Sequence, residues 1–228
     1  MACVSTPEER LAIQDGRVRV SGIYARPPDP PATLVVAHGA GAGMDHPFMA
    51  GFTRAMNDEG IATLRFNFSY IENGRRAPDP ESLLRETWLA AFAAATARSK
   101  GEPVWAGGKS LGGRIASMVV SDGMPAAGLV FLGYPLHPPG KPERIRDEHL
   151  YRIASPMLFL EGTRDPFATR DLLAGVIAKL GERATLVPIE GGDHSFNVRG
   201  VKRDAREVGA GLAVHAAAFI EGHAQEHA

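Results

Sequence analysis

Three features are scarce in this sequence, and each scarcity excludes a class of protein. The 228 residues include one cysteine, Cys3, so no disulfide can form within the chain. No apolar run approaches the ~18 residues that a membrane-spanning helix needs. The net charge is −1, far from the basic balance that favours nucleic-acid binding. We therefore expect neither a membrane nor a nucleic acid as a partner.

Targeting signals and cofactor motifs are also missing. The first ten residues include Glu8, Glu9 and Arg10 and lack the apolar segment of a signal peptide. The single cysteine fits a reducing compartment, so we expect a cytoplasmic protein. No spacing of histidine, cysteine, aspartate and glutamate suggests a metal site. We expect neither a bound metal nor a cofactor.

What the sequence does contain is the patterning of an α/β domain. Hydrophobic residues make up 44% of the chain and charged residues 22%, and the length suits one domain over residues 1–228. Asp15-Gly16 separates two strand-like runs, which predicts an N-terminal β-hairpin. From residue 33 onward, apolar runs alternate with helix-like segments, which predicts a mostly parallel sheet with helices on both faces. The expected strands are 11–13, 18–24, 33–37, 61–68, 128–134, 157–160 and 184–189, with another from residue 104, and the expected helices are 47–58, 81–98, 115–120, 168–180 and 204–221.

The stretch 104–114 carries the strongest local motif. It contains a match to G-x-S-x-G, in which a serine occupies a tight turn between a strand and a helix. The turn brings strand and helix so close that its flanking residues, Gly108 and Gly112, must be nearly free of side chain. The motif predicts an exposed hydroxyl at Ser110 and an N–H at Leu111 aimed at an oxyanion. Taken alone, it also fits a glycine-rich turn with an incidental serine.

Two later residues follow strands in the order that a serine-based triad requires. Asp165 follows the next-to-last predicted strand, and His194 follows the last one. Because the carboxyl ends of parallel strands meet at one edge of a sheet, Ser110, Asp165 and His194 are predicted to converge. A serine hydroxyl needs a base to take its proton, and His194 can be that base. Asp165 would then orient the imidazole and stabilise its charged form.

Other residues compete for some of these roles. Asp171 and Asp193 are alternative acids, but Asp165 is the one that directly leaves the strand before the histidine's strand. Adjacent side chains such as those of Asp193 and His194 rarely face each other as a triad demands. Lys109, beside the serine, raises the alternative of a Ser-Lys pair. Neighbouring side chains on a tight turn diverge, so we interpret Lys109 as structural or as a surface charge.

The segment 38–43, His-Gly-Ala-Gly-Ala-Gly, is the expected second half of an oxyanion site. Its glycines allow the backbone to approach a substrate oxygen closely. The N–H of Ala40 would pair with that of Leu111, with help from Gly41. A phosphate-binding turn is the alternative, but the P-loop lysine-serine pair and the G-x-G-x-x-G spacing are missing. His38 is expected to brace the turn rather than to react.

The connection 135–153 is basic and rich in proline. It is too short for a large lid, so we expect an open cleft. Tyr134 and His137 are candidate substrate-binding residues, because they follow a strand and lie where a loop can overhang the site. A solvated loop without substrate contacts is the alternative.

These motifs resemble those of the α/β-hydrolase superfamily over most of the chain. A narrower similarity points to the dienelactone-hydrolase-like branch, which includes bacterial proteins and the testis-expressed and NSL-complex-subunit hydrolase-like proteins of animals. The resemblance implies an eight-stranded α/β-hydrolase fold without a large lid and carries Ser110, Asp165 and His194 over as the triad. Dienelactone hydrolase itself uses a cysteine nucleophile where this chain has Ser110. The segments that carry the similarity are His38-Gly39-Ala40-Gly41, Met44-Asp45-His46-Pro47, Arg65-Phe66-Asn67-Phe68, Gly108-Lys109-Ser110-Leu111-Gly112-Gly113-Arg114, Tyr134-Pro135-Leu136-His137 and Arg146-Asp147-Glu148-His149-Leu150.

Together these patterns predict a serine hydrolase of the carboxylesterase type. It would cleave small acyl esters through an acyl-enzyme, with a small-molecule acyl substrate as its partner. A non-catalytic binding or scaffold protein on the same fold is one alternative. A thioesterase, amidase or peptidase using the same triad is another, because specificity depends on pocket shape rather than on the triad. The sequence does not indicate the oligomeric state.

Overall fold

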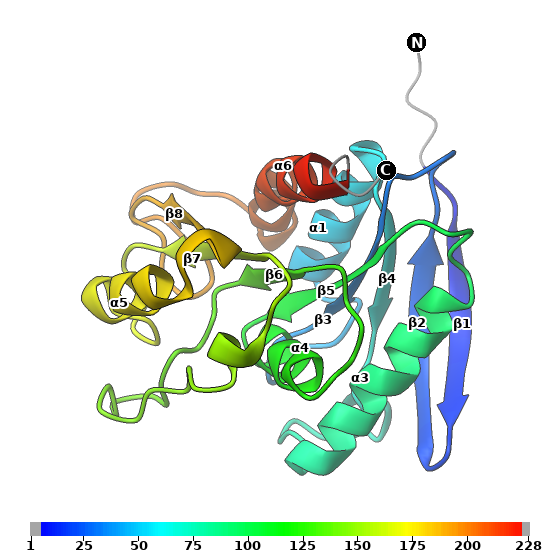
Figure 1. The fold of residues 1–228 in the computed structure, drawn as a ribbon. Helices are drawn as coiled ribbons and strands as arrows, with labels where there is room; N and C mark the ends of the chain where they lie inside the picture. The colour runs from blue at the N-terminus through cyan, green and yellow to red at the C-terminus, as the bar shows by residue number, and fades with distance from the viewer. Residues whose placement is uncertain (1–5, 225–228) are drawn as a thin grey trace.

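The structure, a computed structural model, describes residues 6–224 and contains one eight-stranded sheet (Figure 1). Its strands are β1 (Glu8–Asp15), β2 (Val18–Ala25), β3 (Thr33–Ala37), β4 (Ala62–Phe66), β5 (Val104–Lys109), β6 (Leu129–Leu132), β7 (Met157–Gly162) and β8 (Ala184–Ile189). They lie in the order β1-β2-β4-β3-β5-β6-β7-β8. β1 and β2 form the predicted antiparallel hairpin, β2 pairs antiparallel with β4, and the other neighbours are parallel. Cys3 lies outside the described residues.

Helices cover both faces of this sheet. They are α1 (Pro47–Asp58), α2 (Ser69–Glu72), α3 (Glu81–Thr96), α4 (Leu111–Ser121), α5 (Arg170–Leu180) and α6 (Ala205–Ala224), with short 3-10 turns η1 (Leu150–Arg152) and η2 (Gly181–Arg183). α1 and α6 pack together on one face, and α3, α4 and α5 cover the other (Figure 1). Within residues 6–224, none of the helices has the length and apolar character needed to cross a membrane.

The central strand β3 explains why the sheet is covered on both sides. All five of its residues are buried. Leu34 and Val36 pack into the core under α1 and α6, whereas Val35 and Ala37 pack into the core under α3 and α4. Successive side chains of a strand point to opposite faces, so a continuous apolar run stabilises the fold only when both faces are covered. The alternation predicted from residue 33 onward is confirmed.

Several predicted boundaries were wrong by a few residues. The strand predicted at 128–134 ends at Leu132, because Gly133 has φ +72° and cannot continue extended backbone. The strand predicted at 61–68 ends at Phe66, and the unpredicted helix α2 follows, where the Tyr70 N–H donates to Asp79 Oδ2 at 2.8 Å. α3 ends two residues early, and α5 begins at Arg170 rather than at residue 168.

The carboxyl ends of the parallel strands lie at one edge of the sheet, where the candidate residues gather. Ser110 follows β5, Asp165 follows β7, and His194 follows β8. The 38–43 segment follows β3, which neighbours β5. The connection between β6 and β7 contributes only η1, so among residues 6–224 no lid domain covers this edge.

Candidate active site

Ser110 occupies a strained turn between β5 and α4. Its φ of 49° and ψ of −112° are unusual for a residue with a side chain. A Cβ added to Gly112 would lie 2.4 Å from the Ala37 carbonyl oxygen, and one added to Gly108 would lie 2.6 Å from the same atom. Both glycines are therefore required by the close approach of α4 to β3, as the motif predicted.

A chain of hydrogen bonds joins the three predicted residues. His194 Nε2 lies 2.8 Å from Ser110 Oγ, and His194 Nδ1 lies 2.6 Å from Asp165 Oδ2. The other oxygen of Asp165, Oδ1, accepts the Phe167 N–H at 2.7 Å. Asp165 is therefore held in place on both oxygens, and the imidazole lies directly between the acid and the hydroxyl.

The electrostatics of Asp165 favour its charged form. Burial alone would raise the pKa of Asp165, but the hydrogen bond from His194, together with the neighbouring Glu161 carboxyl, outweighs burial and lowers the pKa. An ionised carboxylate against Nδ1 keeps the proton on that nitrogen. The opposite nitrogen, Nε2, is then free to accept a proton from Ser110.

The turn after β3 is braced by His38, as predicted. This buried ring has Nδ1 2.8 Å from the Gly39 carbonyl oxygen, and its Nε2 accepts the Phe68 N–H at 3.2 Å. Burial lowers the pKa of His38 to about 4, so the ring is neutral. The brace fixes the backbone that carries Ala40 and Gly41.

Two N–H groups at this edge are available to a ligand. Leu111 is the first residue of α4, and the first N–H groups of a helix have no partner within the helix. Neither its N–H nor that of Ala40 donates a hydrogen bond to another group among residues 6–224. Leu111 directly follows Ser110, and Ala40 lines the cavity beside Ser110.

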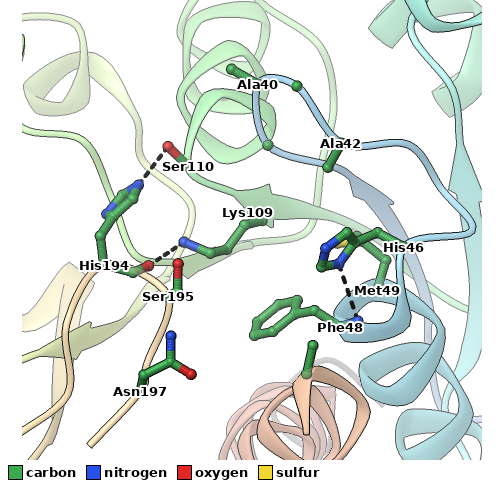
Figure 2. Close-up of a pocket in the computed structure, with 13 residues that line it drawn as sticks. Ala40, Ala42, His46, Phe48, Met49, Lys109, Ser110, His194, Ser195 and Asn197 are labelled. Atoms are coloured by element: carbon green, nitrogen blue, oxygen red, sulfur yellow. Dashed lines mark hydrogen bonds between the residues drawn. The ribbon is translucent and has the colours of Figure 1, made fainter. Parts of the chain in front are cut away.

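A cavity of about 440 Å³ opens beside Ser110. Ser110 and His194 lie on one side of it, and His46, Phe48 and Met49 lie on the other (Figure 2). The full lining consists of Gly39, Ala40, Gly41, Ala42, His46, Phe48, Met49, Lys109, Ser110, His194, Ser195, Asn197 and Ala205.

Lys109 is not a surface charge. Its ammonium donates a hydrogen bond to the His194 carbonyl oxygen (Figure 2). It also lies 5.2 Å from the centre of the Phe196 ring. Burial lowers the pKa of Lys109 to about 8. Of the two interpretations of this residue, the structural one therefore fits: Lys109 ties the loop that carries His194 to the end of β5.

Tyr134 and His137 do not line the cavity, so their predicted contact with substrate does not fit the structure. The Tyr134 hydroxyl is buried and donates to the Arg146 carbonyl oxygen at 3.0 Å. His137 is also buried, with Nδ1 2.9 Å from the Pro138 carbonyl oxygen. Both side chains stabilise the 135–153 connection from inside instead of overhanging the site.

Glu161 is a buried acid that the sequence analysis missed. It lies near the end of β7, is 3% exposed, and accepts the Tyr134 N–H on Oε2 at 2.8 Å. One oxygen of Glu161, one of Asp165 and a nitrogen of His194 all lie within 4.8 Å of one another. The available signal was a glutamate directly after four apolar residues of a buried strand.

The same three side chains carry atoms of the kind that ligate metal ions. The Nδ1 of His194 and the Oδ2 of Asp165 are 2.6 Å apart and share a hydrogen bond. Two ligand atoms of a tetrahedral ion, each ~2.0–2.2 Å from it, lie roughly 3.4 Å apart, so a cation ligated by both atoms would have to separate them. The geometry fits a proton between these atoms.

Comparison with known proteins places this chain in a family. The family described as alpha/beta hydrolase domain matches residues 30–221. A dienelactone hydrolase from Anabaena variabilis is 18% identical, with a TM-score of 0.75, over 96% of this chain and 99% of that chain. A serine hydrolase without lid from Xanthomonas campestris is 18% identical, with a TM-score of 0.70, over 95% and 96%. An alpha-beta serine hydrolase homologue from Coxiella burnetii is 19% identical, with a TM-score of 0.70, over 96% and 98%. The solved structures share the fold, and the family match covers most of the sequence: the chain belongs to the alpha/beta hydrolase domain family.

Proposed function

We propose that this protein is a serine hydrolase of the carboxylesterase type. The observation that carries the proposal is the continuous hydrogen-bonded chain from Ser110 through His194 to Asp165. His194 takes the proton of Ser110 as the oxygen attacks an ester carbonyl carbon, and Asp165 stabilises the resulting imidazolium. The protonated imidazole then gives its proton to the leaving alcohol.

The tetrahedral intermediate carries a negative charge that needs donors. We assign this role to the N–H groups of Leu111 and Ala40, which donate no hydrogen bond within residues 6–224; Gly41 lies beside Ala40 in the cavity lining. One such donor contributes about 10²–10³-fold to kcat in serine hydrolases. Collapse of the intermediate leaves an acyl group on Ser110. Water then attacks the acyl carbonyl carbon while His194 takes a proton from the water, and His194 gives that proton to the Ser110 oxygen as the acid product leaves.

The cavity favours small acyl groups. Its volume of about 440 Å³ is bounded by Phe48 and Met49 opposite Ser110, and no lid formed by residues 6–224 extends it. We infer short acyl esters as the substrate class. Thioesters, amides and peptides use the same chemistry and remain alternatives on this triad.

The narrower relationships belong to the same proposal. The motifs at residues 38–41, 44–47, 65–68 and 108–114 support a place near the dienelactone-hydrolase-like branch and its testis-expressed and NSL-complex-subunit members. The named dienelactone hydrolase from Anabaena variabilis agrees with that branch. We further propose a cytoplasmic location and one domain over residues 1–228, without nucleic acid, membrane, metal or cofactor.

A fluorophosphonate probe tests the proposal directly. Because the probe reacts only with an activated serine, we expect it to label the wild-type chain and not the Ser110→Ala variant. Labelling is read by mass spectrometry of the intact protein and of the peptide that contains residue 110. An unlabelled but folded wild-type chain would support the non-catalytic binding or scaffold alternative.

The acyl preference is a separate prediction. With a series of nitrophenyl esters, we expect kcat/KM to be highest for acyl groups of about two to four carbons. A longer chain would extend beyond the cavity, so its additional apolar surface would not gain the ~25 cal/mol per Å² that burial provides. The measurement is the initial rate at matched concentrations below KM. A higher kcat/KM for long-chain than for short-chain esters would contradict the open, small cleft.

A further inference from the structure

Glu161 is the buried titratable group that the proposed mechanism leaves unused. Glu161 lies in β7, the strand that precedes Asp165, and its side chain lies beside the triad. It is not part of the cavity lining. A lone buried carboxylate is costly, so its surroundings must explain how it is tolerated.

The hydrogen bonds around Glu161 fit a carboxylic acid better than a carboxylate. Its Oε2 accepts the Tyr134 N–H at 2.8 Å. Its Oε1 is buried and receives no hydrogen bond from any donor among residues 6–224. A carboxylate would leave that oxygen without a donor, whereas a protonated Oε1 can itself donate. The acceptor within reach is the carboxylate of Asp165.

The charges that face Glu161 agree with this assignment. Asp165 and His194 face it from the loops after β7 and β8, and Lys109 faces it from the end of β5. Burial, and the hydrogen bond and charge of Asp165, raise the pKa of Glu161 well above its ordinary value, and Lys109 opposes this effect only in part. Two carboxyl groups this close in a buried site hold one proton between them. Asp165 already receives the His194 and Phe167 N–H groups, so the proton belongs on Glu161.

We propose that Glu161 is a positioning residue of the triad: its neutral carboxyl donates a hydrogen bond to Asp165 and so sets how strongly that carboxylate holds the charged form of His194. The inference rests on the proposed function. A donor on Asp165 spreads the negative charge away from the imidazole. It also fixes the carboxylate plane, because Asp165 is then held by the imidazole, by Phe167 N–H and by Glu161.

Two variants separate the neutral donor from its alternatives. Glu161→Gln is neutral and nearly isosteric: its carbonyl oxygen can accept the Tyr134 N–H, and its amide can donate to Asp165. Glu161→Ala removes both groups. For hydrolysis of a short-chain nitrophenyl ester, we expect Glu161→Gln to keep kcat within about twofold, with the acid limb of the pH profile unmoved. We expect Glu161→Ala to lower kcat by about tenfold with little change in KM, and to move the acid limb to higher pH, because Asp165 then binds the imidazolium more strongly.

Two results would overturn the proposal. If Glu161→Gln moves the acid limb to lower pH, a negative charge has been removed, and Glu161 was ionised. If Glu161→Ala leaves the rate and the pH profile unchanged, the residue does not position the triad.

A stability measurement keeps the inference testable if the wild-type chain proves inactive. Urea unfolding of wild type and Glu161→Gln is compared across pH. The unfolded chain releases the Glu161 proton near pH 4.5, whereas the folded chain with its raised pKa keeps it. Wild type must therefore lose stability relative to Glu161→Gln as pH rises above that value. A gain in its relative stability would indicate a carboxylate and would exclude the neutral donor, whatever the activity.

Discussion

Replacing Ser110 or His194 by alanine is expected to lower kcat for a short acyl ester by about 10³-fold or more. Ser110 Oγ and His194 Nε2 are 2.8 Å apart. Attack needs both side chains, because the hydroxyl is a weak nucleophile until the imidazole takes its proton. The double variant should be no slower than either single one, because the residues act as one unit. The measurement is kcat and KM for all three variants, with unfolding free energies to exclude misfolding.

The choice of acid is tested in the same assay. Asp165→Asn is expected to lower kcat by up to about 10⁴-fold, because an amide cannot hold the Nδ1 proton as a carboxylate does. Asp171→Asn is the matched control: Asp171 is exposed in the first turn of α5, and its replacement should leave kcat unchanged. Equal losses in the two variants, or full activity in Asp165→Asn, would contradict the assignment of the triad.

Gly112→Ala is expected to lower both the stability and the activity of the protein, because the added methyl group meets backbone atoms. Its new Cβ would meet the Ala37 carbonyl oxygen at 2.4 Å and the His38 carbonyl oxygen at 2.7 Å. These are backbone atoms of a central strand and its loop, which cannot move aside as the end of a flexible side chain can. Overpacking of this kind costs about 1–3 kcal/mol or more and would push Ser110 away from His194. We expect both a lower free energy of unfolding in urea and a loss of activity of at least about tenfold.

A matched glycine controls for helix propensity in that experiment. Gly175 lies in α5, and nothing lies within 4 Å of the position of an added Cβ. Gly175→Ala should therefore stabilise the protein by about 0.5–1 kcal/mol, as alanine does in an exposed helix, without affecting activity. A Gly112→Ala variant that matches wild type in stability and rate would show that the elbow is looser than its 2.4 Å approach indicates.

Much of the fold followed from local sequence pattern. The apolar runs of residues 33–37 and 157–160 predicted strands, and the structure places them in β3 and β7. Asp15-Gly16 predicted the hairpin that pairs β1 with β2. The boundary errors occurred where one residue changes the backbone direction, as Gly133 does after β6. Such endings depend on a single φ angle, which periodicity over several residues does not report.

Sequence reasoning located some residues of the candidate site and misplaced or missed others. G-x-S-x-G located Ser110, and strand order placed Asp165 and His194 near it, because the motif and the loop positions are local features of the sequence. Tyr134 and His137 were wrongly expected at the cleft, since a loop after a strand can turn inward as readily as outward. Glu161 was missed because its role depends on a contact with Asp165. The two residues are four apart in the sequence, and only the path of the chain after β7 brings their carboxyl groups together.

The sequence by itself determined the alternation of strands and helices, the tight turn at Ser110 and the chain order of the three candidate residues. Those features depend on spacing, glycine and apolar periodicity, which act between near neighbours. Only the tertiary structure decided that Lys109 binds the His194 carbonyl and that Glu161 lies against Asp165. Contacts between the ends of β5, β7 and β8 depend on strand order and register, and no residue carries that information locally.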